Sequence, residues 1–472
     1  YKESNIKMSL YKCLLFFHIA TSIKSGKLNL INSYRFKAIQ NYLLDDEYWR
    51  KNKETILRET GLSKFSSGDK YLDTMKKSLD NKYHQVNKRV LGNQNQHFKL
   101  KSDKRPSITT PATERKDHEY ITTALSKEGY TPILKVLKEI NAATAFTDSL
   151  KHFSTKNVKM KPKEETLLTG IIGKGCNIGL RKLANISTGL TEHILHNTVT
   201  WCFDLKNIMD ANRKVVDFIH SLELANNYIA KPAVLHSSSD GRKVNVAVDS
   251  LHANYSYKYF GNEKGVTMYT FIDERQSIFH STVFSSSDRE ATYVIDGLMH
   301  NSVPHTHIHS TDTHGFNEQL FCATHFIDVD FAPRFKNLSH QRIYGLSSRR
   351  TFQKECYPIL PSRMIDRKLI LQNWDDILRF MATIKTNHTS ASQLFKRLSS
   401  YANTHPLYKA LKEFGRIIKS NFILTYYDDV DLRQQIQKQL NRVELTNKFA
   451  HAIFFDNDQA FQDGDKQDQE IS

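Results

Sequence analysis

The segment that follows Pro232 limits the possible folds more than any other part of the chain. The spacing of apolar residues changes there from one typical of helices to one typical of strands. Short runs alternate apolar and polar residues, as half-buried strands do. Ser287-Asp-Arg-Glu290 matches a capping box and predicts an amphipathic helix that continues through Leu298. The other predicted elements are strands at 233–236, 244–248, 267–273, 278–284 and 307–310, a helix at 317–326 and a strand at 329–335.

The order of these elements predicts an α/β, ribonuclease H-like catalytic domain with a helical insertion, preceded by all-α scaffold domains. Helix starts are predicted within the insertion at Asn373 or Asp375 and at Pro406. Residues 101–117 hold two prolines and few apolar groups, so they are interpreted as a linker. The predicted division is a helical N-terminal region at 1–105, a helical scaffold and linker region at 106–232, the catalytic domain at 233–335 plus 441–472, and the insertion at 336–440.

The composition of the chain indicates which partners and which cellular compartment to expect. The 472 residues carry a net charge of +17, which is common for proteins that meet nucleic acid, although a merely soluble basic protein fits the charge equally well. The five cysteines show no CxxC pair, which favours a reducing, cytoplasmic compartment over a disulfide framework or a zinc module. The apolar run at 13–23 is too short to span a bilayer and is predicted to be a core helix, so no membrane partner is expected.

Three acidic residues indicate the chemistry. Asp240 and Asp312 each follow a β-type run, and Glu444 lies on a predicted helix. Asp312 follows Asp240 by 72 residues (312 − 240), and Glu444 follows Asp312 by 132 (444 − 312). Carboxylates at the ends of adjacent strands and on a helix suit two Mg²⁺ ions, with Mn²⁺ as a substitute, for phosphodiester cleavage. Asp-Gly and Asp-Thr are also ordinary turn-forming pairs, and spacing alone leaves that alternative open.

Basic residues near these acids are candidate DNA contacts. Lys448 and His451 fall four and seven residues after Glu444, on the same side of its helix. A Glu-Lys surface pair is the more common occurrence at such a spacing. Arg334, in Phe-Ala-Pro-Arg, ends a predicted strand and suits bidentate binding of phosphate, with a local salt bridge as the alternative.

Other notable residues are interpreted as structural or supporting. The alternating His305, His307 and His309 suggest a metal site, but on a strand they suit a mixed oxygen site poorly and are interpreted as structural. His314 closely follows Asp312 and is the better candidate for orienting a metal ligand through a hydrogen bond. The glycines at 173–179 lack the spacing of a nucleotide-binding loop and are predicted to allow close helix packing. The lysine-rich stretch at 156–163 suits either a phosphate contact or a solvated loop.

Several separate motifs, in order along the chain, resemble the Tn-three (TnpA) family of replicative transposases. Upstream, the segments 28–36, 41–44 and 170–180 also look like that family. The resemblance therefore spans nearly the whole chain. The main motifs are His-Ser-Ser-Ser-Asp-Gly at 236–241, Lys-Tyr-Phe-Gly at 258–261, Arg-Glu-Ala-Thr-Tyr-Val-Ile-Asp-Gly at 289–297, His-Ser-Thr-Asp-Thr-His-Gly-Phe at 309–316, Phe-Ala-Pro-Arg at 331–334 and Asn-Lys-Phe-Ala-His-Ala-Ile-Phe-Phe at 447–455.

The resemblance implies a ribonuclease H-like domain whose Asp-Asp-Glu metal triad falls on Asp240, Asp312 and Glu444. It implies nicking of the 3′ ends of a transposon at its inverted repeats, followed by attack of the freed hydroxyls on target DNA. It also implies a homodimer on DNA and action at the bacterial nucleoid. Family members are longer, so the chain is interpreted as a truncated C-terminal portion. The alternatives are a catalytically inactive DNA-binding remnant and a ribonuclease H-like nuclease.

Overall fold

The computed structural model describes residues 7–24, 28–33, 36–101, 105–112, 119–127, 129–154, 161–232, 234–299, 306–313, 315–400 and 405–472. Two of the histidines singled out in the sequence, His305 and His314, lie outside these ranges. So does most of the lysine-rich stretch, although Lys161 is described and pairs with Asp148. Within the described ranges, no helix combines the length and apolar character needed to cross a membrane.

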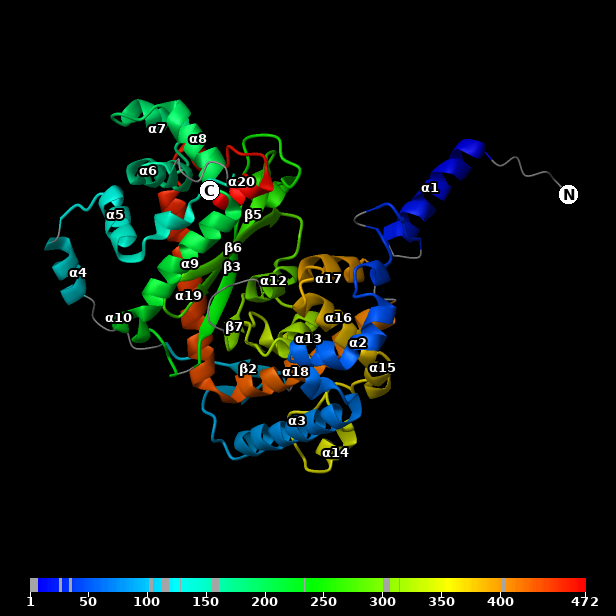
Figure 1. The fold of residues 1–472 in the computed structure, drawn as a ribbon. Helices are drawn as coiled ribbons and strands as arrows, with labels where there is room; N and C mark the ends of the chain where they lie inside the picture. Colours follow the sequence, from blue (N-terminus) through cyan, green and yellow to red (C-terminus); the bar gives the residue numbers. More distant parts are fainter. Residues whose placement is uncertain are drawn as a thin grey trace.

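A six-stranded mixed sheet is formed by residues between 236 and 331 (Figure 1). Its strands are β3 (His236–Asn245), β4 (Asn254–Tyr255), β5 (Lys264–Asp273), β6 (Ile278–Ser285), β7 (Ile308–Ser310) and β8 (Asp330–Phe331). β3, β5 and β6 form an antiparallel meander, and β4 pairs with the start of β5. On the other side of β3, β7 and then β8 run parallel to it. The sheet order is therefore β6-β5-β3-β7-β8, with β3 in the middle.

Helices cover both faces of this sheet. The long helix α19 (Val430–Ile453) packs along β3, β5 and β7 on one face. On the other face, α12 (Val294–Met299) contacts β6, and α13 (Glu318–Phe326) contacts β8. A Cβ atom on Gly297 would overlap the ring of Phe271, so α12 lies almost directly on β5. Because side chains alternate along β3, its even-numbered residues face α19 and its odd-numbered residues face α12.

The remaining helices form three groups. The first group is α1 (Met8–Lys24), α2 (Asp46–Glu59) and α3 (Gly68–Leu91). The second group is α4 (Glu119–Lys127), α5 (Ile133–Thr144), α6 (Glu164–Gly175), α7 (Leu180–Ile186), α8 (Glu192–Cys202), α9 (Leu205–Ser221) and α10 (Glu223–Asn226). The third group is α14 (Arg349–Gln353), α15 (Arg367–Gln372), α16 (Trp374–Lys385), α17 (Ala391–Ser399) and α18 (Pro406–Asp428). Two short helices, α11 (Tyr257–Phe260) and α20 (Lys466–Ile471), lie beside the sheet.

One hydrophobic core joins the first helical group to the third group and to the sheet. The indole of Trp374 donates a hydrogen bond to the carbonyl of Phe65 at 2.8 Å, and the rings of Phe65 and Phe326 lie 4.5 Å apart. The indole of Trp49 donates to Asp375 at 3.0 Å. The long α18 packs against both α3 and α13, so it connects the helical part to the sheet.

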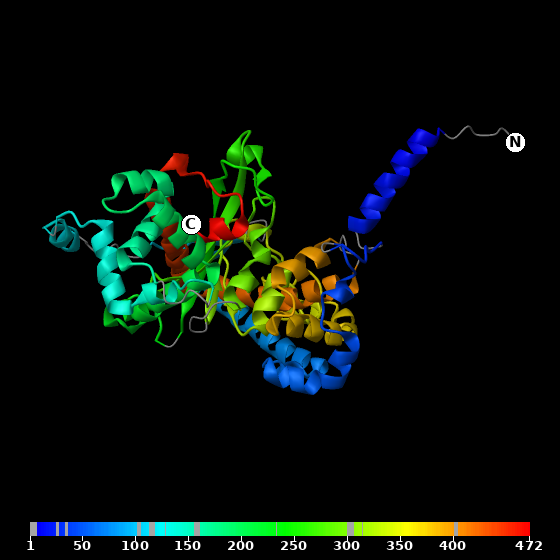
Figure 2. The same ribbon diagram turned by 45° about the horizontal axis from the view of Figure 1, so that its top comes forward.

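Two expectations for the first part of the chain are wrong. The run at 13–23 is helical, but Leu14, Phe16 and Phe17 are exposed on α1, which projects away from the body in both views (Figures 1 and 2). Its apolar residues surround the helix instead of forming one stripe, so no single face is favoured for burial. Within the expected linker, β2 (Pro106–Ile108) pairs with β1 (Phe98–Leu100), so the scaffold is not entirely helical.

Around the sheet, the sequence predicted the helices better than the strands. The first two predicted runs merge into the single strand β3, so Asp240 lies inside a strand and not after one. The predicted capping box does not form: Glu290 begins a short 3₁₀ helix, η5 (Glu290–Thr292), which has no side-chain cap. The last strand, predicted over 329–335, is limited to β8. The helix carrying Glu444 begins at Val430, earlier than the predicted boundary at 441.

Several helix predictions are confirmed. Asn317 caps α13 by accepting a hydrogen bond from the backbone N–H of Leu320, Asn373 is the N-cap of α16, and Pro406 opens α18. Gly170 and Gly173 lie on α6, where added Cβ atoms would come within 3.0 Å of Phe203 and 2.8 Å of Leu183. Of the glycines at 173–179, Gly173 therefore allows close packing, as the sequence suggested, whereas added Cβ atoms at Gly175 and Gly179 would have no neighbour within 4 Å.

Candidate active site

Asp240 and Asp312 lie side by side because of the register between β3 and β7. The paired residues of these parallel strands, such as Ser238 and Ser310, differ by 72 positions (310 − 238). Asp240 lies two residues after Ser238, and Asp312 lies two residues after Ser310, so the two aspartates are separated by the same 72 positions. Asp312 lies just beyond the carboxyl end of β7, and Asp240 lies within the neighbouring, longer β3. The register therefore brings the two predicted acids near each other, and the charge of Asp312 contributes to raising the pKa of Asp240.

A buried network of serine and histidine side chains supports this register. His309 shares hydrogen bonds with the hydroxyls of Ser237, at 2.8 Å, and Ser239, at 2.9 Å. His236 shares one with Ser310 at 2.7 Å. Burial lowers the pKa of both His236 and His309 to about 3, so both rings are neutral at physiological pH.

The structural interpretation of the alternating histidines is confirmed for the two that are described. The ring of His309 is fully engaged in the serine network, and Nδ1 of His307 accepts a hydrogen bond from the backbone N–H of Leu235 at 3.1 Å. The ring of His309 joins β3 to β7, and the ring of His307 joins the segments that precede them, so both histidines have structural contacts.

The carboxylate of Asp240 lies in a largely buried, negatively charged environment. Asn447 on α19 donates a hydrogen bond from Nδ2 to Oδ2 of Asp240 at 3.0 Å. Burial, followed by the charges of Glu290 and Asp312, raises the pKa of Asp240 from 3.8 to about 6, while the hydrogen bond from Asn447 acts in the opposite direction. A bound cation would relieve this repulsion, since it compensates the charge that burial makes unfavourable.

Asp312 begins a tight turn beyond β7. Its Oδ1 accepts a hydrogen bond from the backbone N–H of Gly315 at 3.0 Å. On either side of Asp312, Thr311 accepts through its carbonyl from the N–H of Arg334 at 3.0 Å, and Thr313 donates through its hydroxyl to the carbonyl of Arg334 at 3.1 Å. Arg334 is therefore fixed beside the turn that carries Asp312.

Arg334 also connects this turn to Glu444. Nη2 of Arg334 lies 3.8 Å from Oε1 of Glu444, and Nη1 donates to Gln437 at 3.3 Å. The side chains of Arg334 and Glu444 are 33% and 47% exposed, so this ion pair contributes little to stability. Glu444 precedes Asn447 by three residues, which brings it to the same end of the sheet as Asp240. Lys448 and His451 are exposed on the same helix.

The oxygen atoms of the three predicted acids are of the type that a hard divalent cation prefers, but the structure does not bring all three together. Carboxylate oxygens of Asp240, Asp312 and Glu444 are the ligand type that Mg²⁺ and Mn²⁺ prefer. Oδ1 of Asn447, buried next to Asp240, has no hydrogen-bond partner within the described part of the chain. Within the same residues, no three His, Cys, Asp or Glu side chains are arranged closely enough to hold a metal ion. Glu444 instead faces Arg334 in this arrangement.

Two residues at the site were not recognised from the sequence. Asn447 was noted only as a member of the motif at 447–455, and its contact with Asp240 was not predicted. Its position three residues after Glu444 could have indicated this, because residues at that spacing lie near each other on a helix. Glu290 was assigned to a helix cap, whereas its charge acts on Asp240. No local pattern could have identified Glu290, because its position depends on how the 3₁₀ turn packs over β3.

The fold and the paired acids define a domain of the DDE type, and comparison with known proteins names the family. The chain belongs to the Tn3 transposase DDE domain family, whose model matches residues 135–472. DDE domains generally use divalent metal ions, and the family implies a ribonuclease H-like fold. The resemblance stated from the sequence is confirmed.

Curated relatives agree with this family. The chain is 29% identical over 461 residues to the transposase for transposon Tn1546 of Enterococcus faecium, and 30% identical over 468 residues to that for transposon Tn2501 of Escherichia coli. It is 26% identical to the transposase for transposon gamma-delta of Escherichia coli (strain K12). Each match covers 96% of this chain and 45% of the relative. The chain thus spans about half the length of the curated relatives it matches.

The environment of Asp240 predicts an unusual pH dependence of stability. The pKa of Asp240 in the folded protein, about 6, lies above the ordinary value of 3.8, so the folded protein binds the carboxyl proton more tightly than the unfolded chain does. The stabilisation that this proton provides is present below pH 3.8 and is lost as the pH rises to about 6. We expect Asp240→Asn to raise the free energy of unfolding at pH 7.5 without cations by about 1–3 kcal/mol and to change it little at pH 4. Urea unfolding in a chelator measures both values. Asp249→Asn, at an exposed carboxylate, is the control, and destabilisation by Asp240→Asn at both pH values would contradict the assignment.

Proposed function

We propose that the chain carries the catalytic domain of a DNA transposase that acts in replicative transposition. In this proposal, it nicks the 3′ ends of transposon DNA at the terminal inverted repeats and joins the freed ends to target DNA. The observation that carries the proposal is the 72-residue offset that the two aspartates share with the paired residues of β3 and β7, which supports placing Asp240 near Asp312. Membership of the Tn3 transposase DDE domain family supports it.

We assign the catalytic and metal-binding roles to Asp240, Asp312 and Glu444, with two Mg²⁺ ions that Mn²⁺ can replace. When bound, such ions activate the attacking water or 3′-hydroxyl and stabilise the leaving oxygen. The protein's own contribution is to hold the carboxylates. Asn447 orients Asp240 through its hydrogen bond, and the turn closed by Gly315 fixes Asp312. His314, proposed to orient a metal ligand, lies outside the described residues.

We propose that Arg334, Lys448 and His451 contact the DNA backbone. Lys448 and His451 are exposed on the helix that carries Glu444, and Arg334 is partly exposed beside that residue. The net charge of +17 favours a polyanionic partner. Arg334 lies beside Glu444, and Lys448 and His451 lie further along α19. DNA would therefore lie along α19, beside Glu444.

The proposed architecture is a ribonuclease H-like domain interrupted by a helical insertion after residue 335, with the boundary predicted at 441 moved back to Val430, where α19 begins. An antiparallel meander followed by two strands parallel to its first strand supports it. The regions at 1–105 and 106–232 are proposed to form the N-terminal and scaffold units. Inverted-repeat DNA, target DNA and a second copy of the chain on DNA are the proposed partners, at the nucleoid of a bacterial cytoplasm.

A plasmid experiment tests the activity. The purified chain is incubated with supercoiled plasmid carrying the element's ends, and with pre-cleaved ends plus a target plasmid, in Mg²⁺, Mn²⁺ or Ca²⁺. We expect nicking with Mg²⁺ and Mn²⁺, little with Ca²⁺, and covalent joining of 3′-hydroxyl ends to the target. Nicking without joining would favour a nuclease. DNA binding without either reaction would favour an inactive remnant.

The DNA-contact assignment predicts a change in salt dependence. A side chain that neutralises one phosphate releases counterions on binding, so Lys448→Ala is expected to reduce the slope of log affinity against log salt by about one. The measurement is fluorescence anisotropy of a labelled duplex at four salt concentrations. Lys53→Ala, which removes an equally basic side chain from α2, is the control. An unchanged slope for Lys448→Ala would remove this residue from the interface.

A further inference from the structure

A fourth carboxylate, that of Glu290, lies against the strand that carries Asp240. Gly241 follows Asp240 on β3, and Tyr269 on β5 is its partner across the strands. A Cβ atom on Gly241 would overlap Oε1 of Glu290 and lie 2.8 Å from its Cδ. The carboxylate of Glu290 therefore fills the space that a side chain at position 241 would need, immediately beside the first acid of the triad.

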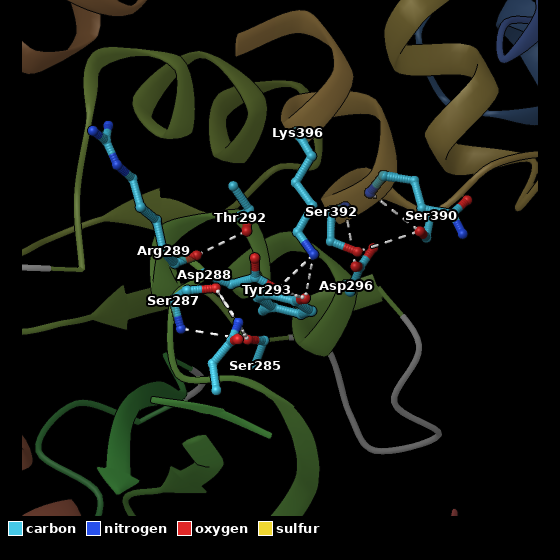
Figure 3. A network of polar contacts seen from close by, with 12 residues as sticks. Ser285, Ser287, Asp288, Arg289, Thr292, Tyr293, Asp296, Ser390, Ser392 and Lys396 are labelled. Atoms are coloured by element: carbon cyan, nitrogen blue, oxygen red, sulfur yellow. Dashed lines mark hydrogen bonds and ion pairs between the residues drawn. The ribbon is translucent and has the colours of Figure 1, made fainter. Parts of the chain in front are cut away.

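The segment around Glu290 is held by a network of polar contacts (Figure 3). Thr292 donates to the carbonyl of Arg289 at 2.8 Å, which closes the 3₁₀ turn. Asp288 accepts hydrogen bonds from the hydroxyl of Tyr293 at 2.8 Å and from Nζ of Lys396 at 2.6 Å. Nζ of Lys396 also donates to the hydroxyl of Tyr293 at 2.8 Å, so the residues before and after Glu290 are both tied to α17 and hold its backbone in place.

The same network is extended by the acid at the start of α12. Asp296 accepts from the backbone N–H groups of Ala391 and Ser392, at 2.7 and 3.0 Å, at the N-terminus of α17. A carboxylate in this position interacts favourably with the unpaired N–H groups of a helix start. The 3₁₀ turn, α12 and α17 therefore form one supported unit above Gly241.

Lys243 partly balances the charge of Glu290. Its Nζ lies 3.5 Å from Oε1 of Glu290 and donates to the hydroxyl of Thr267 at 2.6 Å. The two charged side chains are 20% and 19% exposed, so solvent screens this pair less than a surface pair. A carboxylate and an ammonium group thus lie on the α12 face of β3, next to the triad acid on the opposite face.

A separate observation points to a missing positive group near Asp240. Asn447 is 6% exposed, and while its Nδ2 donates to Asp240, its buried Oδ1 has no hydrogen-bond partner among the residues that the structure describes. A buried acceptor without a partner is unfavourable by about 1–3 kcal/mol. An oxygen in this position next to a carboxylate suits a cation or a cation-bound water.

We propose that Glu290 is a positioning residue for the divalent-cation site, and that its charge, balanced by Lys243, sets the affinity of the site for the cation. This inference rests on the proposed function. Removing the negative charge weakens the attraction for a cation at Asp240, whereas removing the positive charge of Lys243 strengthens it. Two substitutions in one ion pair therefore have opposite effects, which a merely structural pair would not produce.

The test is the binding of Mn²⁺ to the full chain without DNA, followed by electron paramagnetic resonance of the free ion. Glu290→Gln is expected to weaken binding about tenfold, as is typical for residues that support metal ligands. Lys243→Gln is expected to tighten binding about threefold. Glu263→Gln, at an exposed glutamate that accepts from Asn245, is the matched control and is expected to leave affinity unchanged. Thermal unfolding of each variant confirms that it is folded.

The outcomes separate the inference from the proposed function. If Asp240→Asn binds Mn²⁺ as the unaltered chain does, the proposed cation site itself is wrong. If Asp240→Asn loses binding but Glu290→Gln does not change it, only the role of Glu290 is overturned. Equal weakening by Glu290→Gln and Lys243→Gln would also overturn it, because the pair would then act through local structure and not through charge.

Discussion

Replacing Asp312 by asparagine is expected to lower cation-dependent nicking of supercoiled plasmid by at least about a thousandfold, the scale seen when a group that acts in the transition state is removed. Asparagine keeps the size of the side chain and can still accept the hydrogen bond from Gly315, so the turn is preserved. What is lost is a negatively charged oxygen beside Asp240. Asp240→Asn and Glu444→Gln are expected to have effects of similar size.

The same variants are expected to bind DNA with affinity within about twofold of the unaltered chain, because a carboxylate contributes no attraction to phosphate. Nicking rates and duplex affinity are measured on one preparation of each variant. Asp249→Asn, which removes an exposed carboxylate paired with Lys264, serves as the control for charge alone. Nicking by Asp312→Asn at more than a tenth of the original rate would show that Asp312 does not have the proposed catalytic role.

Gly415→Ala is expected to reduce the free energy of unfolding by about 3 kcal/mol or more, or to prevent folding altogether. Gly415 lies on α18 where this helix crosses α13. An added Cβ atom would overlap the backbone carbonyl of Glu318 and approach the backbone nitrogen of Cys322 at 3.3 Å. Backbone atoms cannot rotate away as a side chain can, so the two helices must separate, and α13 supports β8 and the loop that carries Arg334.

Gly175→Ala provides a comparison with the same chemical change. Gly175 ends α6, and an added Cβ atom there would have no neighbour within 4 Å. This substitution is expected to be neutral or to stabilise by about 0.5–1 kcal/mol, because alanine favours the helix. Urea unfolding followed by circular dichroism compares the two variants. Equal stabilities would show that α13 and α18 can adjust their spacing.

The sequence predicted those parts of the fold that depend on local signals. Asn317 and Pro406 mark helix starts because side-chain capping and a fixed backbone angle act within one turn. Asn373 is the N-cap residue of α16 by position, but its side chain makes no capping hydrogen bond. The family motifs pointed to Asp240 and Asp312, and the charge of Asp312 acts on Asp240 in the structure. The roles of these residues and of Glu444 stay predictions.

What the sequence could not predict depends on contacts between distant segments. Glu290 reaches Gly241 only because η5 folds over β3, and its apparent capping motif was misleading. The apolar residues of α1 suggested burial, yet no stripe directs one face of the helix to the body. The lengths of β3 and β8 also differ from the local patterns, because strand ends are set by pairing with neighbours.

The hydrophobic core that the upstream helices share with the third helical group and the sheet limits how the chain can be divided. The family model begins at residue 135, but Trp49 and Phe65 are fully buried far upstream of it. The indole of Trp49 and the carbonyl of Phe65 form hydrogen bonds with α16, and the ring of Phe65 packs against Phe326 on α13. The helices around Trp374 would lose part of their interior if the chain were divided between these regions. The unit that folds together is therefore larger than the matched domain. When related elements recombine, we expect the product to fold only if the exchange of sequence occurs outside the segments that share this core.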